Sequence, residues 1–194
     1  MRIQAIASGS NGNCFYVEEG ETRLLVDAGI SLRRIERALQ DLGTSLEALT
    51  AVLLTHDHGD HTAAVGDLVK KYSVPVFCTE KTAENTRFRN GDHLVFSEFF
   101  RPVKAGIPFQ TGTFSVRPVR THHDTADPVF YRIDSETRSF ALVTDTGYVD
   151  RNMEEALRDL DALLIESNYD EHMLEVGPYP FQLKRRVLGN EGHL

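Results

Sequence analysis

One short segment concentrates side chains that bind metal ions. Residues 55–61 read Thr-His-Asp-His-Gly-Asp-His and hold three of the eight histidines of this 194-residue chain. Histidines one residue apart can place both imidazoles on one side, and the Asp-His pair after Gly59 can bend back towards them. Four ligands within six residues suit two adjacent metal ions better than one. A solvated polar loop is the less favoured interpretation, since such loops rarely concentrate three histidines. The candidate ligands are His56, His58, Asp60 and His61.

Ionisable residues also stand directly after other apolar runs. Asp27 follows Leu-Leu-Val, Asp145 follows Leu-Val-Thr, and Glu166 follows Leu-Leu-Ile. In α/β proteins the carboxyl ends of the strands form the edge at which ligand sites gather. A single carboxylate at a strand end is more often a turn or cap residue. The coincidence with the histidine-rich segment therefore favours a shared site.

The remaining histidines are less clearly assigned by the residues alone. His122 and His123 follow an apolar run, and either could supply another imidazole while the other is a neighbouring or surface group. His193 is ambiguous, because a histidine next to a chain end is usually exposed. His93 and His172 stand apart from any such group, and we assign them no function.

Other catalytic motifs fit less well. The chain has no Gly-x-Ser-x-Gly motif, and residues 8–13, Ser-Gly-Ser-Asn-Gly-Asn, lack the Lys-Ser/Thr ending of a phosphate-binding P-loop. That segment is equally consistent with a tight turn and with backbone N–H groups presented to an anion. The one dense basic cluster, Lys184-Arg185-Arg186, is more typical of a solvated helix face than of a phosphate-binding site.

Short strands in the first half of the chain must position the histidine-rich segment. Ser31 is a plausible N-cap, and apolar residues at helical spacing, from Leu32 to Leu42, predict an amphipathic helix that ends at Gly43. A strand before the histidines, a helical stretch through Lys71 and a further strand indicate a βαβ crossover. The predicted strands are 2–7, 14–18, 23–26, 51–54 and 74–78.

The second half repeats this plan loosely. A helix carries Met153, Ala156, Leu157 and Leu160, among strands predicted at 114–119, 129–133, 140–143 and 162–165. Two similar α/β halves with no linker between them predict a single domain over residues 1–194. The simplest architecture is a four-layer αββα sandwich, in which two sheets pack together with helices outside.

Composition excludes several classes of protein. With 41% hydrophobic and 26% charged residues, the chain is typical of a globular domain, and no apolar run is long enough to cross a membrane. A net charge of −8 opposes a broad basic face for nucleic acid, so a polyanionic substrate needs local help from metal or a small basic patch. Two isolated cysteines and an N-terminus without a secretory signal predict a cytoplasmic protein.

Together these residues resemble the metallo-β-lactamase-fold hydrolases. All five ligand motifs of that superfamily occur in order, at Asp27, 56–61, His123, Asp145 and His193. Residues 8–13, Glu-Ser-Asn-Tyr-Asp at 166–170 and Gly-Pro-Tyr-Pro at 177–180 resemble its YycJ/WalJ-like branch, bacterial cytoplasmic proteins described as metal-dependent nucleases. The resemblance covers the whole chain, although relatives continue beyond the residue that corresponds to Leu194. We therefore expect the sandwich to lack its C-terminal segment, which would leave little to hold His193 in place.

The resemblance implies a centre for two divalent metal ions. His56, His58 and His123 would hold one ion, and Asp60, His61 and His193 the other, with Asp145 bridging them. Asp27 would contact a ligand histidine, not a metal ion, and so orient its ring. A set of histidines and carboxylates accommodates zinc, manganese and, less readily, iron.

The activity implied is a phosphodiesterase on nucleic acid, most specifically a DNA exonuclease. Asp60 would then act as the catalytic residue that orients the attacking hydroxide or accepts its proton. Hydrolysis of a small ester, thioester or lactam on the same centre is the alternative enzyme, weakened as a lactamase because neither cysteine lies near a ligand motif. A di-iron redox or sensor protein is a further alternative, although redox relatives usually carry glutamate where this chain has His58.

Overall fold

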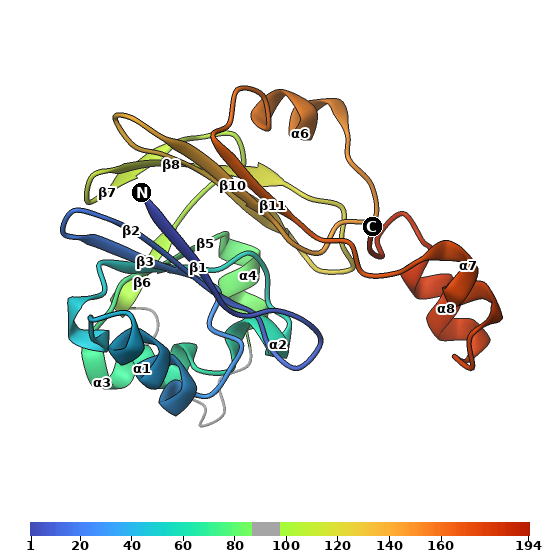
Figure 1. The fold of residues 1–194 in the computed structure, drawn as a ribbon, viewed down its shortest axis with the longest axis horizontal. Helices are drawn as coiled ribbons and strands as arrows, with labels where there is room; N and C mark the ends of the chain where they lie inside the picture. Colours follow the sequence, from blue (N-terminus) through green and yellow to red (C-terminus); the bar gives the residue numbers. More distant parts are fainter. Residues whose placement is uncertain (87–97) are drawn as a thin grey trace.

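Two β-sheets form the centre of the molecule (Figure 1). The computed structural model describes residues 1–86 and 98–194, so His93 lies outside the described residues. In the first sheet the strands follow chain order. β2 pairs antiparallel with β1 and with β3, whereas the pairs from β3 to β6 are parallel. Its strands are β1 (Arg2–Ala7), β2 (Cys14–Glu19), β3 (Thr22–Val26), β4 (Ala51–Leu53), β5 (Val76–Cys78) and β6 (Phe100–Pro102).

The second sheet has the order β11-β10-β9-β8-β7. Its neighbours pair antiparallel except β10 and β11, which run parallel and are joined by a crossover through a helix. This crossover brings the carboxyl ends of β10 and β11 to the same edge. We predicted this edge from Asp145 and Glu166, which directly follow the two apolar runs. Its strands are β7 (Phe109–Thr111), β8 (Phe114–Arg120), β9 (Val129–Asp134), β10 (Ser139–Val143) and β11 (Ala162–Ile165).

The helices are short and lie mostly outside the sheets. The predicted amphipathic helix is α1, and it begins after Ser31, whose side chain makes no capping hydrogen bond. Gly43 follows it with a φ of 81°, a backbone conformation that glycine adopts without strain. The helices are α1 (Leu32–Asp41), a 3-10 turn (Leu46–Ala48), α2 (Gly59–Thr62), α3 (Val65–Tyr72), α4 (Glu80–Asn85), α6 (Arg151–Ala156), α7 (Glu171–Val176) and α8 (Phe181–Val187).

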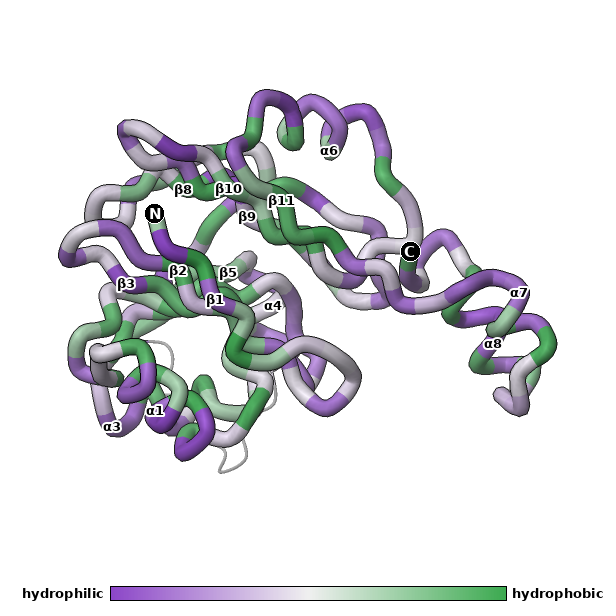
Figure 2. Tube along the Cα trace, in the orientation of Figure 1, coloured by the Kyte–Doolittle hydropathy of each residue, from purple (hydrophilic) through white to green (hydrophobic). Residues whose placement is uncertain are grey.

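Alternation along single strands creates the layers. In β3, Leu24 and Val26 pack between the two sheets, whereas Leu25 packs towards α1 and α3. In β10, Leu142 packs between the sheets and Val143 towards α6. Three apolar layers therefore separate four layers of secondary structure, which confirms the predicted αββα sandwich. Hydrophobic segments follow the sheets in Figure 2.

The hairpin of α7 and α8 lies at one end of the molecule, apart from the sandwich (Figure 1). Both helices are too short for a hydrophobic period to be recognised, and we did not predict them. They expose large apolar side chains, among them Met173 and Phe181. Across the described ranges, every helix is too short and too polar to span a membrane.

Candidate metal centre

Asp27 organises the loop that follows β4. Its buried carboxylate accepts hydrogen bonds from the backbone N–H and the hydroxyl of Thr55, both at 2.9 Å. It also lies 2.8 Å from Nδ1 of His61, a distance at which that nitrogen donates to the carboxylate. Asp27 itself has a φ of 61°, a left-handed conformation that aspartate tolerates better than most residues. This geometry is consistent with the expectation that Asp27 orients a ligand histidine, and that histidine is His61.

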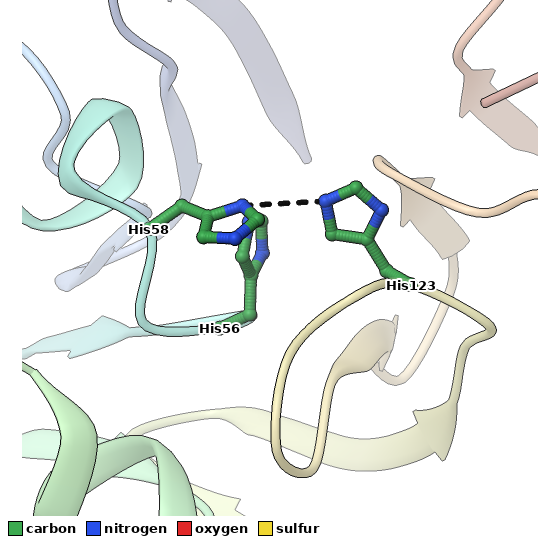
Figure 3. Close-up of side chains that lie close together, drawn as sticks. All are labelled: His56, His58 and His123. Atoms are coloured by element: carbon green, nitrogen blue, oxygen red, sulfur yellow. Dashed lines mark hydrogen bonds between the residues drawn. The ribbon is translucent and has the colours of Figure 1, made fainter. Parts of the chain in front are cut away.

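Three imidazoles from two loops meet on one side of the centre. His56 and His58 come from the loop after β4, and His123 comes from the loop after β8 (Figure 3). Nδ1 of His58 lies 3.3 Å from Nε2 of His123. One ligand nitrogen from each of the three rings lies within 4.8 Å of the others, so the three could hold one ion. This is the trio that the resemblance implied.

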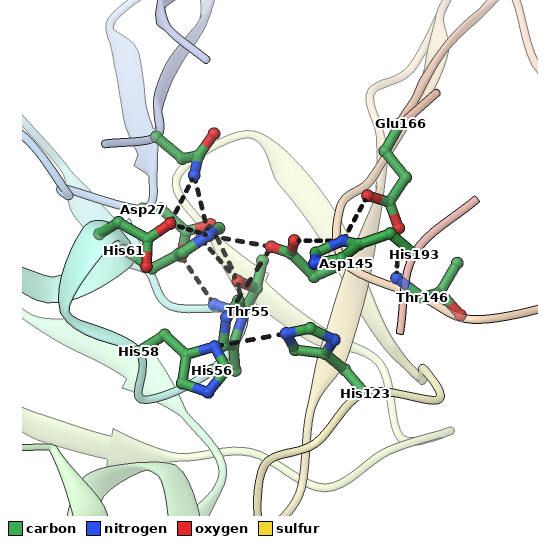
Figure 4. Close-up of polar contacts among 12 residues, drawn as sticks. Asp27, Thr55, His56, His58, His61, His123, Asp145, Thr146, Glu166 and His193 are labelled. Atoms are coloured by element: carbon green, nitrogen blue, oxygen red, sulfur yellow. Dashed lines mark hydrogen bonds and ion pairs between the residues drawn. The ribbon is translucent and has the colours of Figure 1, made fainter. Parts of the chain in front are cut away.

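Asp145 stands between this trio and two further histidines (Figure 4). Its Oδ2 lies 2.9 Å from Nε2 of His61 and 3.8 Å from Nε2 of His56, while its Oδ1 lies 3.2 Å from Nδ1 of His193. His56, His61 and Asp145 form a second group of potential ligands, and His123, Asp145 and His193 form a third. The carboxylate that was expected to bridge two ions is thus shared by two of the groups.

Unpaired buried atoms test whether these residues fit a metal ion. Nε2 of His56 is buried and has no hydrogen-bond partner in the part of the chain described, and Oδ2 of Asp145 has only ion-pair contacts. A buried polar atom left without a hydrogen bond costs about 1–3 kcal/mol. Both atoms belong to groups that bind divalent metals, so a cation at this point satisfies them together. The donor set therefore fits metal.

The carboxylates around the centre stabilise positive charge on two neighbouring histidines. Burial lowers the pKa of His61, but the Asp27 and Asp145 carboxylates outweigh this effect and raise that pKa to about 10. Hydrogen bonds to Asp145 and Glu166 raise the pKa of His193 to about 9. Burial, reinforced by His61, holds the pKa of His56 well below its ordinary value. Burial opposes ionisation of Asp145, yet the neighbouring imidazoles of His193 and His61 keep its pKa below the usual range.

Asp60 lies at the edge of the centre rather than inside it. Its side chain is 36% exposed, and its Oδ2 lies 3.6 Å from Nε2 of His61. It belongs to none of the three ligand groups among the described residues. The Asn13 side chain lies between the two, with Nδ2 at 2.9 Å from Nε2 of His61 and 3.4 Å from the Asp60 carboxylate. The sequence indicated the segment 8–13 but gave no reason to select Asn13.

The two adjacent histidines after β8 have different surroundings. His123 is buried within the centre, whereas His122 stacks on Tyr148 at 3.9 Å and contacts the Asp150 carboxylate at 2.9 Å. Geometry thus brings His123 to the candidate ligands and leaves His122 outside. His172 lies on α7 and is exposed.

The last residues of the chain are held by hydrogen bonds, contrary to the expectation that little would fix them. The N–H of His193 donates to the Val187 carbonyl at 3.1 Å, and the N–H of Asn168 donates to the Leu194 carbonyl at 2.7 Å. Glu166 contacts Nδ1 of His193 at 2.9 Å. The strand-end pattern identified Glu166, but its contact with His193 could not be inferred from sequence.

A cleft of about 830 Å³ opens onto the centre. Its walls come from the segment 8–13, the loops after β4, β8, β10 and β11, and α8. The cleft includes six of the expected ligands, and Arg186 stands on its wall. The six are His58, Asp60, His61, His123, Asp145 and His193.

Comparison with known proteins identifies the family. Residues 22–193 match the model of the beta-lactamase superfamily domain. The chain is 36% identical to the exodeoxyribonuclease YycJ of Bacillus anthracis over 194 residues, which is all of this chain and 73% of that protein. It is 38% identical to the exodeoxyribonuclease WalJ of Streptococcus pneumoniae serotype 2, again over all of this chain and 72% of that protein.

Solved structures show the same fold at low identity. Zinc-bound PqqB from Methylobacterium extorquens superposes with a TM-score of 0.68 at 20% identity, over 84% of this chain and 63% of that one. The metallo-beta-lactamase fold protein YhfI from Bacillus subtilis gives a TM-score of 0.66 at 18% identity, over 86% and 71%. The chain belongs to the metallo-β-lactamase superfamily, in the branch of the YycJ and WalJ relatives, and is a metal-dependent hydrolase.

Proposed function

We propose that this protein is a two-metal phosphodiesterase that shortens DNA from an end. The observation that carries the proposal is the position of Asp145, which belongs to two ligand groups, one that joins His56 to His61 and one that joins His123 to His193. A bridging carboxylate is what two adjacent ions require, and two-metal centres serve phosphodiester hydrolysis. Two relatives named exodeoxyribonuclease, at 36% and 38% identity, support the same substrate.

Each member of the centre has a defined part in this proposal. Asp27 holds the His61 ring through Nδ1 and leaves Nε2 as its ligand nitrogen. One ion would be held by His56, His58 and His123, the other by Asp60, His61 and His193, and Asp145 would contact both. Divalent cations bound there supply a nucleophile at neutral pH and neutralise charge on the phosphate.

Asp60 is the residue we propose as the proton acceptor. Its carboxylate faces the cleft and is the most exposed of the carboxylates at the centre. A position at the rim suits a group that must exchange a proton with a substrate or solvent. The Asn13 amide, 3.4 Å from its Oδ2, fixes the direction of the carboxylate.

Arg186 favours a phosphate-containing substrate over a neutral one. The basic cluster on α8 was expected to be a solvated face, yet Arg186 lines the cleft. Its guanidinium donates to both oxygens of Asp124, at 2.6 and 3.1 Å, and Asp124 lies 3.6 Å from Nε2 of His58. Arginine pairs well with phosphate oxygens, so a cationic group beside the metal ligands gives an acidic chain a local site for a polyanion.

The experiment that tests this function uses purified protein of the full 194 residues with its metal content quantified. DNA labelled at the 5′ or the 3′ end should shorten with Zn²⁺ or Mn²⁺ present, and an aryl phosphodiester should be cleaved while a chromogenic lactam stays largely intact. Asp145→Ala, prepared in parallel, should reduce the activity at least about 100-fold. Efficient lactam turnover without DNA cleavage would overturn the proposal.

A further inference from the structure

Glu166 is a buried carboxylate whose hydrogen-bond partners join separate segments. Its side chain is 7% exposed. It accepts from Nδ1 of His193 at 2.9 Å, from Nδ2 of Asn168 at 2.8 Å, and from the backbone N–H groups of Thr146 and Leu194. Burial of a carboxylate is costly unless it is paired, and within the described ranges His193 is the one ionisable base in contact with it.

The same carboxylate holds two of the proposed ligands. Thr146 directly follows Asp145, whose φ of 50° is unusual for a residue with a side chain. By accepting the Thr146 N–H, Glu166 supports that backbone conformation, while its other oxygen fixes the ring of His193 (Figure 4). One side chain at the end of β11 thus sets the relative positions of a ligand after β10 and a ligand in the last turn of the chain.

The contact with His193 repeats a construction found on the other side of the centre. Nδ1 of His61 faces Asp27 at 2.8 Å, and Nδ1 of His193 faces Glu166 at 2.9 Å, which is nearer to that nitrogen than Oδ1 of Asp145 at 3.2 Å. In each pair a proton on Nδ1 can be shared with the carboxylate, so that Nε2, once deprotonated, offers its lone pair to a metal ion. Carboxylates behind ligand histidines fix the tautomer and the ring orientation and increase the basicity of the ligand.

We propose that Glu166 is the positioning residue that orients His193 for the second metal ion, as Asp27 orients His61. The inference rests on the two-metal function proposed above, but it concerns metal binding and needs no DNA cleavage for its test. Glu166 acts through His193 and has no contact with substrate in this assignment.

The test is a double-mutant cycle on zinc binding. Glu166→Gln keeps the size of the side chain and an oxygen for the Thr146 N–H but removes the charge behind His193. Zn²⁺ titrations by calorimetry, with metal content by elemental analysis, should show two ions in the unmodified protein. They should show roughly 10- to 100-fold weaker binding of the second ion in Glu166→Gln. His193→Ala should lose that ion, and the double variant should bind zinc as His193→Ala does.

Two controls separate orientation from folding. Glu136→Gln makes the same chemical change at an exposed turn and should bind zinc as the unmodified protein does. Thermal unfolding of each metal-free variant checks that the fold persists. In the zinc-loaded proteins, the ¹⁵N chemical shifts of the His193 imidazole should report a proton on Nδ1 in the unmodified protein and a mixture of tautomers in Glu166→Gln.

Three results would overturn the inference. They are undiminished zinc affinity in Glu166→Gln, losses that multiply in the double variant, and an unmodified protein that binds fewer than two ions. Two tight zinc ions without any DNA cleavage would instead contradict the proposed function and leave the role of Glu166 intact.

Discussion

The adjacent residues His122 and His123 give a test at the scale of single side chains. Only His123 lies among the candidate ligands. His122 instead stacks on Tyr148 and contacts the Asp150 carboxylate. His123→Ala should weaken zinc binding by at least about tenfold and remove most hydrolysis, whereas His122→Ala should retain both metal and rate within a few-fold. Calorimetry and a phosphodiesterase assay on both variants check this. Equal losses in the two variants would show that the wrong imidazole was selected.

Protonation of two histidines leads to a second prediction. The pKa values of His61, about 10, and His193, about 9, are raised above the ordinary value, so at pH 7.5 without metal both rings carry a proton on each nitrogen and a positive charge. Ligand nitrogens must be deprotonated before they bind a metal. Zinc binding at pH 7.5 should therefore release about two protons per chain, and the release should disappear as the pH rises through 9 and 10. Titration in buffers of different ionisation enthalpy measures it. Identical heats in all buffers at pH 7.5 would contradict the charge states.

Sequence reasoning succeeded for residues that lie together in the chain. The segment 55–61 carries its chemistry within one loop, so its pattern was visible before folding. Asn13 was not selected, and Glu166 was identified only as a strand-end carboxylate, because the contacts that they make with His61 and His193 span 48 and 27 positions. A pattern of residue types along the chain contains no information on such pairs.

At the scale of elements, the density of apolar residues explains which strands were predicted. The strands from β2 to β4 and from β8 to β10 are dense in apolar residues because both faces of their sheets are covered, and their ranges were predicted within a few residues. β6 and β7 were not predicted. Each has three residues, and pairing with a neighbouring strand rather than local propensity makes them extended. The helix predicted to include Leu160 ends at Ala156.

Close packing of two loops makes Gly29 the most sensitive glycine at the centre. A Cβ at Gly29 would lie 1.5 Å from the backbone oxygen of Asp60, and the N–H of Gly29 donates to the Asn13 carbonyl at 2.7 Å. Gly29→Ala should destabilise the fold by roughly 1–3 kcal/mol and weaken zinc binding, because the segment 59–62 must move. Urea unfolding and zinc titration measure the two effects.

Gly59 provides the matched control for Gly29. It lies between His58 and Asp60 in the sequence, yet a Cβ there meets nothing within 4 Å. Gly59→Ala should change stability by no more than about 0.5 kcal/mol, as is usual for a substitution without steric conflict. A Gly59 variant as damaged as the Gly29 variant would mean that the loop tolerates no side chain at all, and the packing explanation would fail.

The helix α8 brings adjacent arginines into different environments. Arg186 lines the cleft. Arg185 is not among the residues that line the cleft, and its guanidinium lies 6.0 Å from the centre of the Phe181 ring. Arg186→Ala should raise the KM for DNA by on the order of tenfold and reduce its dependence on salt, since a phosphate contact is lost. Arg185→Ala should leave KM within about twofold. Steady-state kinetics at two salt concentrations measure KM for both variants. Equal increases in KM would mean that α8 attracts DNA through its overall charge and not through Arg186 in particular.

At the scale of the whole molecule, the centre joins the two halves of the sandwich. His56, His58 and His61 follow a strand of the first sheet, and His123 and Asp145 follow strands of the second. A cation held by both sets would link the carboxyl ends of two sheets that otherwise meet through an apolar layer and a few hydrogen bonds, such as that from the Tyr131 hydroxyl to the Leu54 carbonyl. It also offsets negative charge in a chain of net charge −8. We therefore expect metal binding and folding to be coupled in this architecture.

This coupling predicts that metal stabilises the fold and that Asp145 carries much of the effect. Free zinc at 100 times its dissociation constant adds about 2.7 kcal/mol to the free energy of unfolding. For a domain of this size that is a rise in Tm of roughly 5–10 °C. Thermal unfolding with zinc and with a chelator should show this rise in the unmodified protein and in His122→Ala. Asp145→Ala should lose most of it, because both ligand groups that share Asp145 lose a donor. An undiminished rise in Asp145→Ala would mean that zinc binds elsewhere, or that the histidines hold it without the carboxylate between them.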